Sequence, residues 1–121
     1  MWLSTNKGFL SIVSHPQDKD ALLVRARRHG DIESMFPDAK VERTAGRDYL
    51  YRASIPRTTV AATVAVRLCD IDYGNFKNSV RDDKLHRAYH RVWDVMADLQ
   101  AVKPYGRDSA AARKREGLPN R

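Results

Sequence analysis

The sequence predicts an α+β fold, a two-layer sandwich in which helices cover one face of a four-stranded, largely antiparallel sheet. Two pairs of short segments have strand-like patterns, and a short polar link joins the members of each pair, as in β-hairpins. A later segment, residues 83–102, keeps a helical period of apolar residues. The 121 residues suit one domain. We therefore expect the order β-β-α-β-β-α-α within residues 1–102, followed by a flexible basic tail over 103–121.

The first predicted hairpin joins residues 8–15 to residues 21–27 through the polar link 16–20. The earlier segment is apolar on both faces, which is typical of a central strand. The later segment has two unlike faces, because alternate side chains of a strand point to opposite sides. One face carries Leu22, Val24 and Ala26, and the other carries Leu23, Arg25 and Arg27.

A short helical turn is predicted over residues 31–36, where Asp31 is suited to cap the first turn and Pro37 to end it. Residues 40–44 and 48–54 predict a second hairpin with its turn at 45–47. Along the second strand of this hairpin, alternation places four side chains on one face: Tyr49, Tyr51, Ala53 and Ile55.

The next predicted helix begins at Pro56, whose missing N–H costs nothing in a first turn, and runs to about Cys69. Its buried stripe is expected at every fourth residue, and Cys69 is expected to be a small core residue. The stripe consists of Val60, Val64 and Leu68, while Ala61, Ala62 and Ala65 would let the helix lie close to the sheet. The stripe of the last helix consists of Leu85, Ala88, Tyr89, Val92, Met96 and Leu99.

Several classes of protein are excluded by what the sequence lacks. The single cysteine excludes an intrachain disulfide and a cysteine-rich metal site. The first residues do not form a signal peptide, and no apolar run approaches the length of a membrane span. No glycine-rich phosphate loop follows a strand, and no serine lies in a nucleophile elbow. We therefore expect a cytoplasmic protein without a membrane anchor or a cofactor.

The formal net charge of +7 is unevenly distributed along the chain. Residues 101–121 carry +4 of it, and the remaining 100 residues carry only +3. The tail could neutralise nucleic-acid phosphates through its five clustered cations, or it could serve only to keep the protein in solution. These cations are Lys103, Arg107, Arg113, Lys114 and Arg115.

The strongest candidate site is cationic. Arg25 and Arg27 share one strand face, and Arg52 lies on a strand that could pair beside them. Converging guanidinium groups suit phosphate or carboxylate, because each offers a planar pair of donors. Lys77 is a further candidate for binding an anion or a partner. The alternative is a solvated sheet face with ordinary cross-strand ion pairs.

Two further groups of residues are candidates for metal binding or acid–base chemistry. Asp70 and Asp72 could hold a divalent cation with Lys77 facing a phosphate, although such residues also cap helix ends in ordinary loops. His86 and His90 lie four residues apart on one helix face and could share a metal. With arginines around them, a charged helix face is the alternative.

Several short patterns lie between residues 2 and 100. They are Trp2-Leu3-x-Thr5, Gly8-Phe9-x-Ser11-Ile12-Val13, Val24-Arg25-Ala26-Arg27 with Gly30-Asp31, Tyr49-x-Tyr51-Arg52-Ala53, Asp70-Ile71-Asp72-Tyr73-x-Asn75-Phe76-Lys77 and His86-x-x-Tyr89-x-x-Val92-Trp93. Together they resemble a family of small uncharacterised proteins from high-GC bacteria and their phages, and the Asp70–Lys77 pattern is the most specific. The resemblance implies a small cytoplasmic domain of bacterial or phage origin, and it carries over no catalytic residue.

These observations favour a non-enzymatic binding or regulatory module that engages a macromolecular partner. A protein partner is favoured over nucleic acid because residues 1–100 carry so little excess charge, and an open sheet edge could also form a homodimer.

The alternative is a small phosphoester-acting enzyme or a phosphate-binding protein. The three arginines would clamp the phosphate, the two aspartates would hold a metal, and His86 or His90 would be the acid or base. That alternative requires the three groups to meet in one cleft.

Overall fold

A computed structural model describes residues 1–102, and the predicted basic tail over 103–121, with its candidate nucleic-acid contacts, lies outside the described residues. The chain divides into two compact units, Met1–Asp82 and a unit that begins at Asp83. The first unit contains the whole sheet. Within residues 1–102, no helix has both the length and the apolar character needed to cross a membrane.

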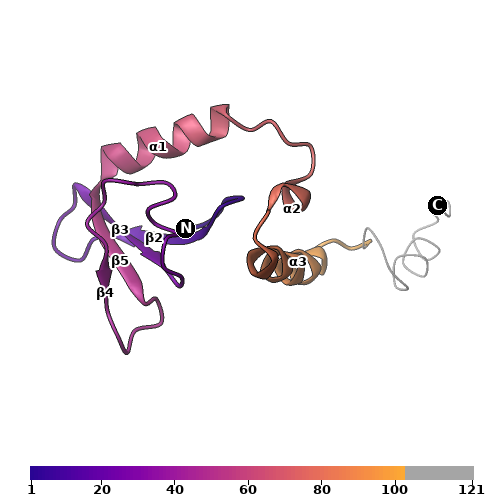
Figure 1. Cartoon of the computed structure of the whole chain (residues 1–121), viewed down its shortest axis with the longest axis horizontal. Helices are drawn as coiled ribbons and strands as arrows, with labels where there is room; N and C mark the ends of the chain where they lie inside the picture. The colour runs from indigo at the N-terminus through magenta and orange to yellow at the C-terminus, as the bar shows by residue number, and fades with distance from the viewer. Residues whose placement is uncertain (103–121) are drawn as a thin grey trace. The chain divides into compact units, whose positions relative to one another are not determined.

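The sheet was predicted to be largely antiparallel with four strands; it is antiparallel throughout and has five (Figure 1). The strands are β1 (Trp2–Ser4), β2 (Phe9–Ser14), β3 (Ala21–Ala26), β4 (Glu42–Arg43) and β5 (Tyr51–Pro56), in the spatial order β1-β2-β3-β5-β4. The strand missing from the prediction is β1. Its three residues are too few to show a strand period, and its pairing with β2 defines it.

The helices are α1 (Arg57–Cys69), α2 (Phe76–Ser79) and α3 (Asp83–Ala97). α1 follows β5 without a linker, and the Arg57 N–H donates to the Asp20 carbonyl at 2.8 Å. α1 packs against β3 and β5. In α3, Leu85 and Tyr89 are buried, whereas the later stripe residues Val92, Met96 and Leu99 are exposed. Ala88, also in the predicted stripe, is exposed, so only Leu85 and Tyr89 of that stripe are buried.

The core lies on the face of the sheet that α1 covers. It consists of Leu10, Ile12, Val24, Ala26, Ala53 and Ile55 from the strands, with Ile32, Met35, Phe36 and Val60 above them. Because register pairs Val24 with Ala53, these side chains share a face, as the alternation in the sequence predicted.

The predicted buried stripe of α1 is wrong beyond its first half. Val60 is buried and Val64 is half-buried, but Leu68 is 64% exposed. Exposure rises along the stripe because α1 extends past the strands beneath it. For the same reason Cys69, expected in the core, is exposed. Ala61, Ala62 and Ala65 are exposed for a different reason, because they lie on sides of the helix turned away from Val60 and Val64.

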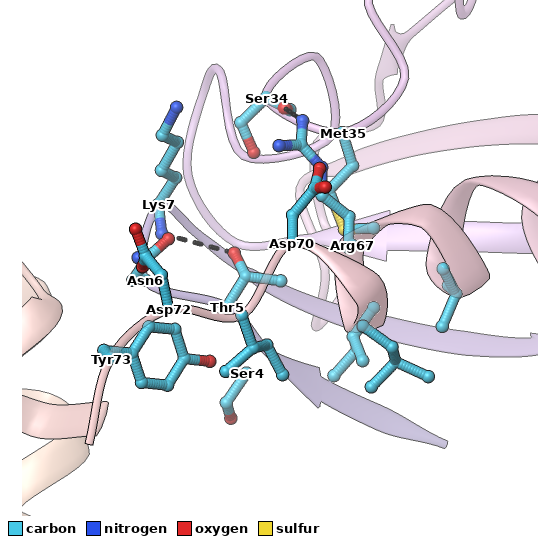
Figure 2. Close-up of a pocket in the computed structure, with 14 residues that line it drawn as sticks. Ser4, Thr5, Asn6, Lys7, Ser34, Met35, Arg67, Asp70, Asp72 and Tyr73 are labelled. Carbon is cyan, nitrogen blue, oxygen red and sulfur yellow. Dashed lines mark hydrogen bonds between the residues drawn. The ribbon is translucent and has the colours of Figure 1, made fainter. Parts of the chain in front are cut away.

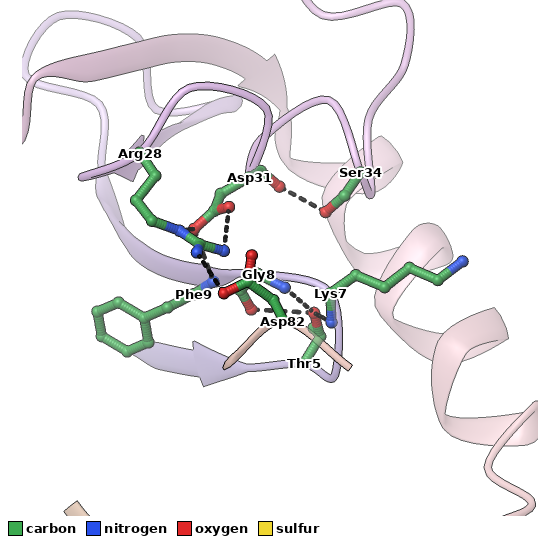
Figure 3. A network of polar contacts seen from close by, with 8 residues as sticks. All are labelled: Thr5, Lys7, Gly8, Phe9, Arg28, Asp31, Ser34 and Asp82. Atoms are coloured by element: carbon green, nitrogen blue, oxygen red, sulfur yellow. Dashed lines mark hydrogen bonds and ion pairs between the residues drawn. The ribbon is translucent and has the colours of Figure 1, made fainter. Parts of the chain in front are cut away.

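Asp31 does not cap a helix, because residues 30–36 form successive hydrogen-bonded turns and no helix. Its buried carboxylate accepts a hydrogen bond from the Phe9 N–H at 3.1 Å and from Arg28 Nη2 at 3.0 Å (Figure 3). Arg28 also contacts Asp82 at 3.2 Å. The hydrogen bond to Asp31, more than any other cause, raises the pKa of Arg28 above its ordinary value, so this guanidinium stays charged.

Gly8 lies directly against Asp31, and this close approach requires glycine. A Cβ at position 8 would be 2.9 Å from Asp31 Cγ and 3.1 Å from its Cα. The β1–β2 turn is thereby held against the turn that follows β3.

We predict that Val60→Ala lowers the free energy of unfolding by about 2 kcal/mol because it empties a buried site. Leu68→Ala, which removes an exposed side chain, should change it by less than about 0.5 kcal/mol. Urea unfolding of both variants measures the difference. Equal losses would contradict an α1 that extends past the sheet.

We predict that Gly8→Ala lowers the free energy of unfolding by about 1–3 kcal/mol, because the added methyl collides with Asp31. Gly74→Ala is the matched control, since a Cβ at Gly74 has no neighbour within 4 Å among the residues that the structure describes. Thermal and urea unfolding measure both variants. A Gly8→Ala protein as stable as the control would show that the turn does not press against Asp31.

Candidate functional site

β1 forms one edge of the sheet, and its outer side has no pairing strand among residues 1–102. The Met1 amine donates to the Ile12 carbonyl at 2.7 Å, and the Ile12 N–H donates to the Met1 carbonyl at 2.8 Å. In an antiparallel ladder the inward-bonding residues alternate, so Leu3 bonds inward like Met1. The backbone N–H and C=O groups of Trp2 and Ser4 therefore point outward.

The turn after β1 is held by the side chain of Thr5. Its Oγ1 accepts from the Gly8 N–H at 3.0 Å and from the Lys7 N–H at 3.2 Å, and it donates to the Gly8 carbonyl at 2.9 Å (Figure 3). The Thr5 N–H also donates to the Gly8 carbonyl at 3.0 Å. β1 and the start of β2 are thus joined by a tightly bonded turn that fixes the direction of the edge.

A cleft of about 230 Å³ lies between β1 with its turn and the end of α1 (Figure 2). Its apolar wall is formed by Leu3, Met35, Val64, Leu68 and Ile71, and its polar rim includes Asn6, Lys7, Arg67, Asp70, Asp72 and Tyr73. Leu3 is the β1 side chain on the α1 side of the sheet, because it pairs with the core residue Leu10. The cleft therefore borders the open edge on the α1 side. We call β1 and this cleft together the edge groove.

Asp70 and Asp72 lie on the rim of this groove, and both are exposed. Asp70 is the C-cap residue of α1, and Asn75, further along, caps α2 by accepting from the Asn78 N–H. Among the described residues, no three His, Cys, Asp or Glu side chains lie close enough together to hold a metal ion. The rim carries the positive charges of Lys7 and Arg67 and the negative charges of the two aspartates, so its net charge is zero.

The three arginines singled out by the sequence do come together, on the sheet face away from α1. Arg25 of β3 pairs directly with Arg52 of β5. The guanidinium carbons of Arg25 and Arg27 lie 4.5 and 4.4 Å from the ring centre of Tyr49. Tyr49 was expected on the opposite face with Ala53 and Ile55, but it precedes β5, where strand alternation does not apply. Lys77 lies on α2, away from these strands (Figure 1).

We call Arg25, Arg27, Arg52 and Tyr49 the arginine–tyrosine cluster. Arg25 donates to Ser11 Oγ at 2.7 Å, and Arg27 donates to the Asp48 carbonyl at 2.8 Å. Arg52 contacts the Asp48 carboxylate at 3.3 Å. Asp48 is the one carboxylate in ion-pair contact with the three arginines among the described residues. The cluster therefore keeps an excess of positive charge.

His86 and His90 lie on α3, in the second unit. His90 lies 3.7 Å from Asp94, and its ring stacks on Trp93 with an interplanar angle of 10°. The contacts of His90 are therefore those of a helix face that carries charged and aromatic side chains. The arginines belong to one face of the sheet and the aspartates to the groove on its α1 side, so the structure does not bring them to one reacting centre.

Comparison of the chain with models of protein families, with curated proteins and with solved structures gives no match. Function must therefore be inferred from the residues themselves. Sequence reasoning missed the edge groove, because it treated Leu68 as core and did not see β1. The exposed Trp2 beside the short polar segment 4–7 was the available signal for β1.

We predict that Tyr49→Leu lowers the free energy of unfolding by about 1–2 kcal/mol, because it removes the ring face that two guanidinium groups contact. Tyr49→Phe keeps that face and should change it by less than about 0.5 kcal/mol. Urea unfolding of the two variants makes the comparison. A Leu variant as stable as the Phe variant would contradict a contribution from the cation–π contacts.

Proposed function

We propose that this chain is a small binding module, not an enzyme, and that it engages an extended segment of a partner protein at the edge groove. The observation that carries the proposal is the outer side of β1, which pairs with no strand of residues 1–102 and lies directly beside an apolar cleft. A sheet edge with free N–H and C=O groups is a template for another strand. Main-chain hydrogen bonds supply the affinity of such an interaction, and pockets for alternate side chains supply its specificity.

The geometry of the groove specifies the bound segment. A strand added to β1 would hydrogen-bond to Trp2 and Ser4, and its alternate side chains would point to opposite sides of the sheet. On the α1 side they would meet the apolar wall that includes Leu68 and Ile71. On the other side they would lie near Trp2, which is 68% exposed and packs edge-on against Phe9 at 5.4 Å. The segment should therefore carry apolar side chains toward the cleft and a large side chain beside Trp2.

The charge of the groove favours protein over nucleic acid as the partner. Lys7 and Arg67 on the rim are balanced by Asp70 and Asp72. A nucleic acid gains affinity chiefly by neutralising its phosphates, and a balanced rim offers little of that. The apolar wall instead gains from burying apolar side chains.

The binding test selects peptides from a displayed random library on the full-length protein and then titrates one selected peptide by calorimetry. Ser4→Pro removes an outward N–H while leaving the bonds to β2, and proline is tolerated at such edge positions. We predict that it weakens peptide binding at least about fivefold, the effect of one lost hydrogen bond of ordinary strength. Ser4→Ala, the matched control, should bind like the unaltered protein.

Leu68→Asp tests the cleft separately, because the residue is exposed and its change should leave the fold intact. We expect it to weaken the same peptide by about tenfold or more, because it places a charge against the apolar side chain of the peptide. Failure to select any peptide, or equal binding by all three variants, would overturn the proposal. A protein that sediments as a dimer until Ser4→Pro makes it monomeric would show that the edge serves a second copy of the chain instead.

A further inference from the structure

The arginine–tyrosine cluster is a second feature, on the opposite sheet face from the cleft of the edge groove. Arg25 and Arg52 occupy directly opposed positions on β3 and β5. Like charges directly opposite each other across a strand pair are destabilising. Ser11 on one side of this row and Glu42 on the other are the neighbouring positions in register. Glu42 is exposed and forms no ion pair with Arg52 among residues 1–102, so the two adjacent arginines retain a repulsion that a bound anion would relieve.

The donors of these guanidinium groups are largely unused. Within residues 1–102, each of the three guanidinium groups makes a single hydrogen bond. The Nε atoms of Arg25 and Arg52 are buried and have no hydrogen-bond partner in the described part of the chain. A buried donor without an acceptor carries the full cost of losing water. The Arg52 side chain is only 16% exposed, so its charge is partly desolvated, which strengthens its attraction for an anion.

The cluster is also compact and held in place. The ring of Tyr49 is 4% exposed and supports two of the guanidinium groups at nearly equal distances. Packing against an aromatic face restricts long side chains before a ligand arrives, which lowers the entropy lost on binding. Arg25 lies opposite Arg52 in register and shares the Tyr49 ring with Arg27, so the three arginines form one local group. A local group of cations suits a small anion, whereas a polymer backbone requires a track of charges.

We propose that Arg25, Arg27 and Arg52 bind one phosphate group, supplied by inorganic phosphate or by a small phosphoester. Each guanidinium offers a planar fork of donors that matches the oxygens of phosphate. Phosphate carries more charge than a carboxylate and has oxygens on several sides, so it can contact three arginines at once. Asp48 remains on the rim of this site, where it reduces the positive charge without removing it.

Calorimetric titration of the full-length protein tests this site with inorganic phosphate, phosphoserine and adenosine monophosphate at constant ionic strength. Acetate is the carboxylate comparison. We expect phosphate to bind more tightly than acetate. If phosphoserine or the nucleotide binds more tightly than inorganic phosphate, a phosphoester is the ligand; if inorganic phosphate binds most tightly, free phosphate is.

Arg27→Gln is the main variant because Arg27 is exposed beyond the end of β3. We expect it to lower phosphate affinity by about tenfold, the factor for one lost charge-assisted hydrogen bond. Arg43→Gln is the matched control, because it removes an equal charge from an exposed position on β4 that pairs with Tyr51 and not with the cluster. It should bind phosphate like the unaltered protein. Arg52→Lys keeps the charge but loses the planar fork, and it should also weaken binding.

Three outcomes would overturn the proposal. They are the absence of phosphate binding, equal losses in Arg27→Gln and Arg43→Gln, and duplex DNA binding much tighter than phosphate with a steep dependence on salt. Equal losses would mean that only overall charge attracts the anion, and the DNA result would mean that the surface serves a polyanion. Because Arg27 is not part of the edge groove, Arg27→Gln should bind the selected peptide normally, so the two proposals can fail independently.

Discussion

The buried carboxylate of Asp31 joins segments that are far apart in the sequence. It accepts the N–H of Phe9 at the start of β2 and pairs with Arg28 just after β3, and Arg28 in turn reaches Asp82. A charge this deeply buried is tolerated only when it is paired and hydrogen-bonded. The position of the β1–β2 turn therefore depends on this carboxylate and on the absence of a side chain at Gly8. The β1–β2 turn then sets the direction of the β1 edge.

A second constraint, the mismatch in length between α1 and the sheet, makes the edge groove. α1 contributes Val60 to the core and then continues past the strands with Leu68 still on the same side. An apolar helix end that projects beyond its sheet leaves apolar surface to be covered. Here that surface and the open edge of β1 border one cleft. α1 and β1, which both pack side chains against the small core, thus also form the surface that we propose as the binding site.

Strand alternation in the sequence predicted the core face and the convergence of Arg25 with Arg52, because the period of a strand decides which side each residue faces. It could not predict β1, since three residues show no period. It placed Tyr49 on the wrong face because that residue precedes the strand. The helical period of α1 identified the side that faces the sheet but not how far the sheet extends beneath it. The sequence suggested that Asp31 caps the turn beside it, which is a local signal. The Asp31 carboxylate instead accepts from the N–H of Phe9, 22 residues away.

The central claim is that the edge of β1 accepts an additional strand. Amide hydrogen exchange of residues 2–4, measured by NMR with and without a selected peptide, tests it most directly. In the free protein the Trp2 and Ser4 amides should exchange quickly while the inward-bonded Leu3 amide is protected. Bound peptide should slow exchange at Trp2 and Ser4 and leave Leu3 unchanged. Peptide that binds at saturation without slowing exchange at Trp2 and Ser4 would contradict strand addition.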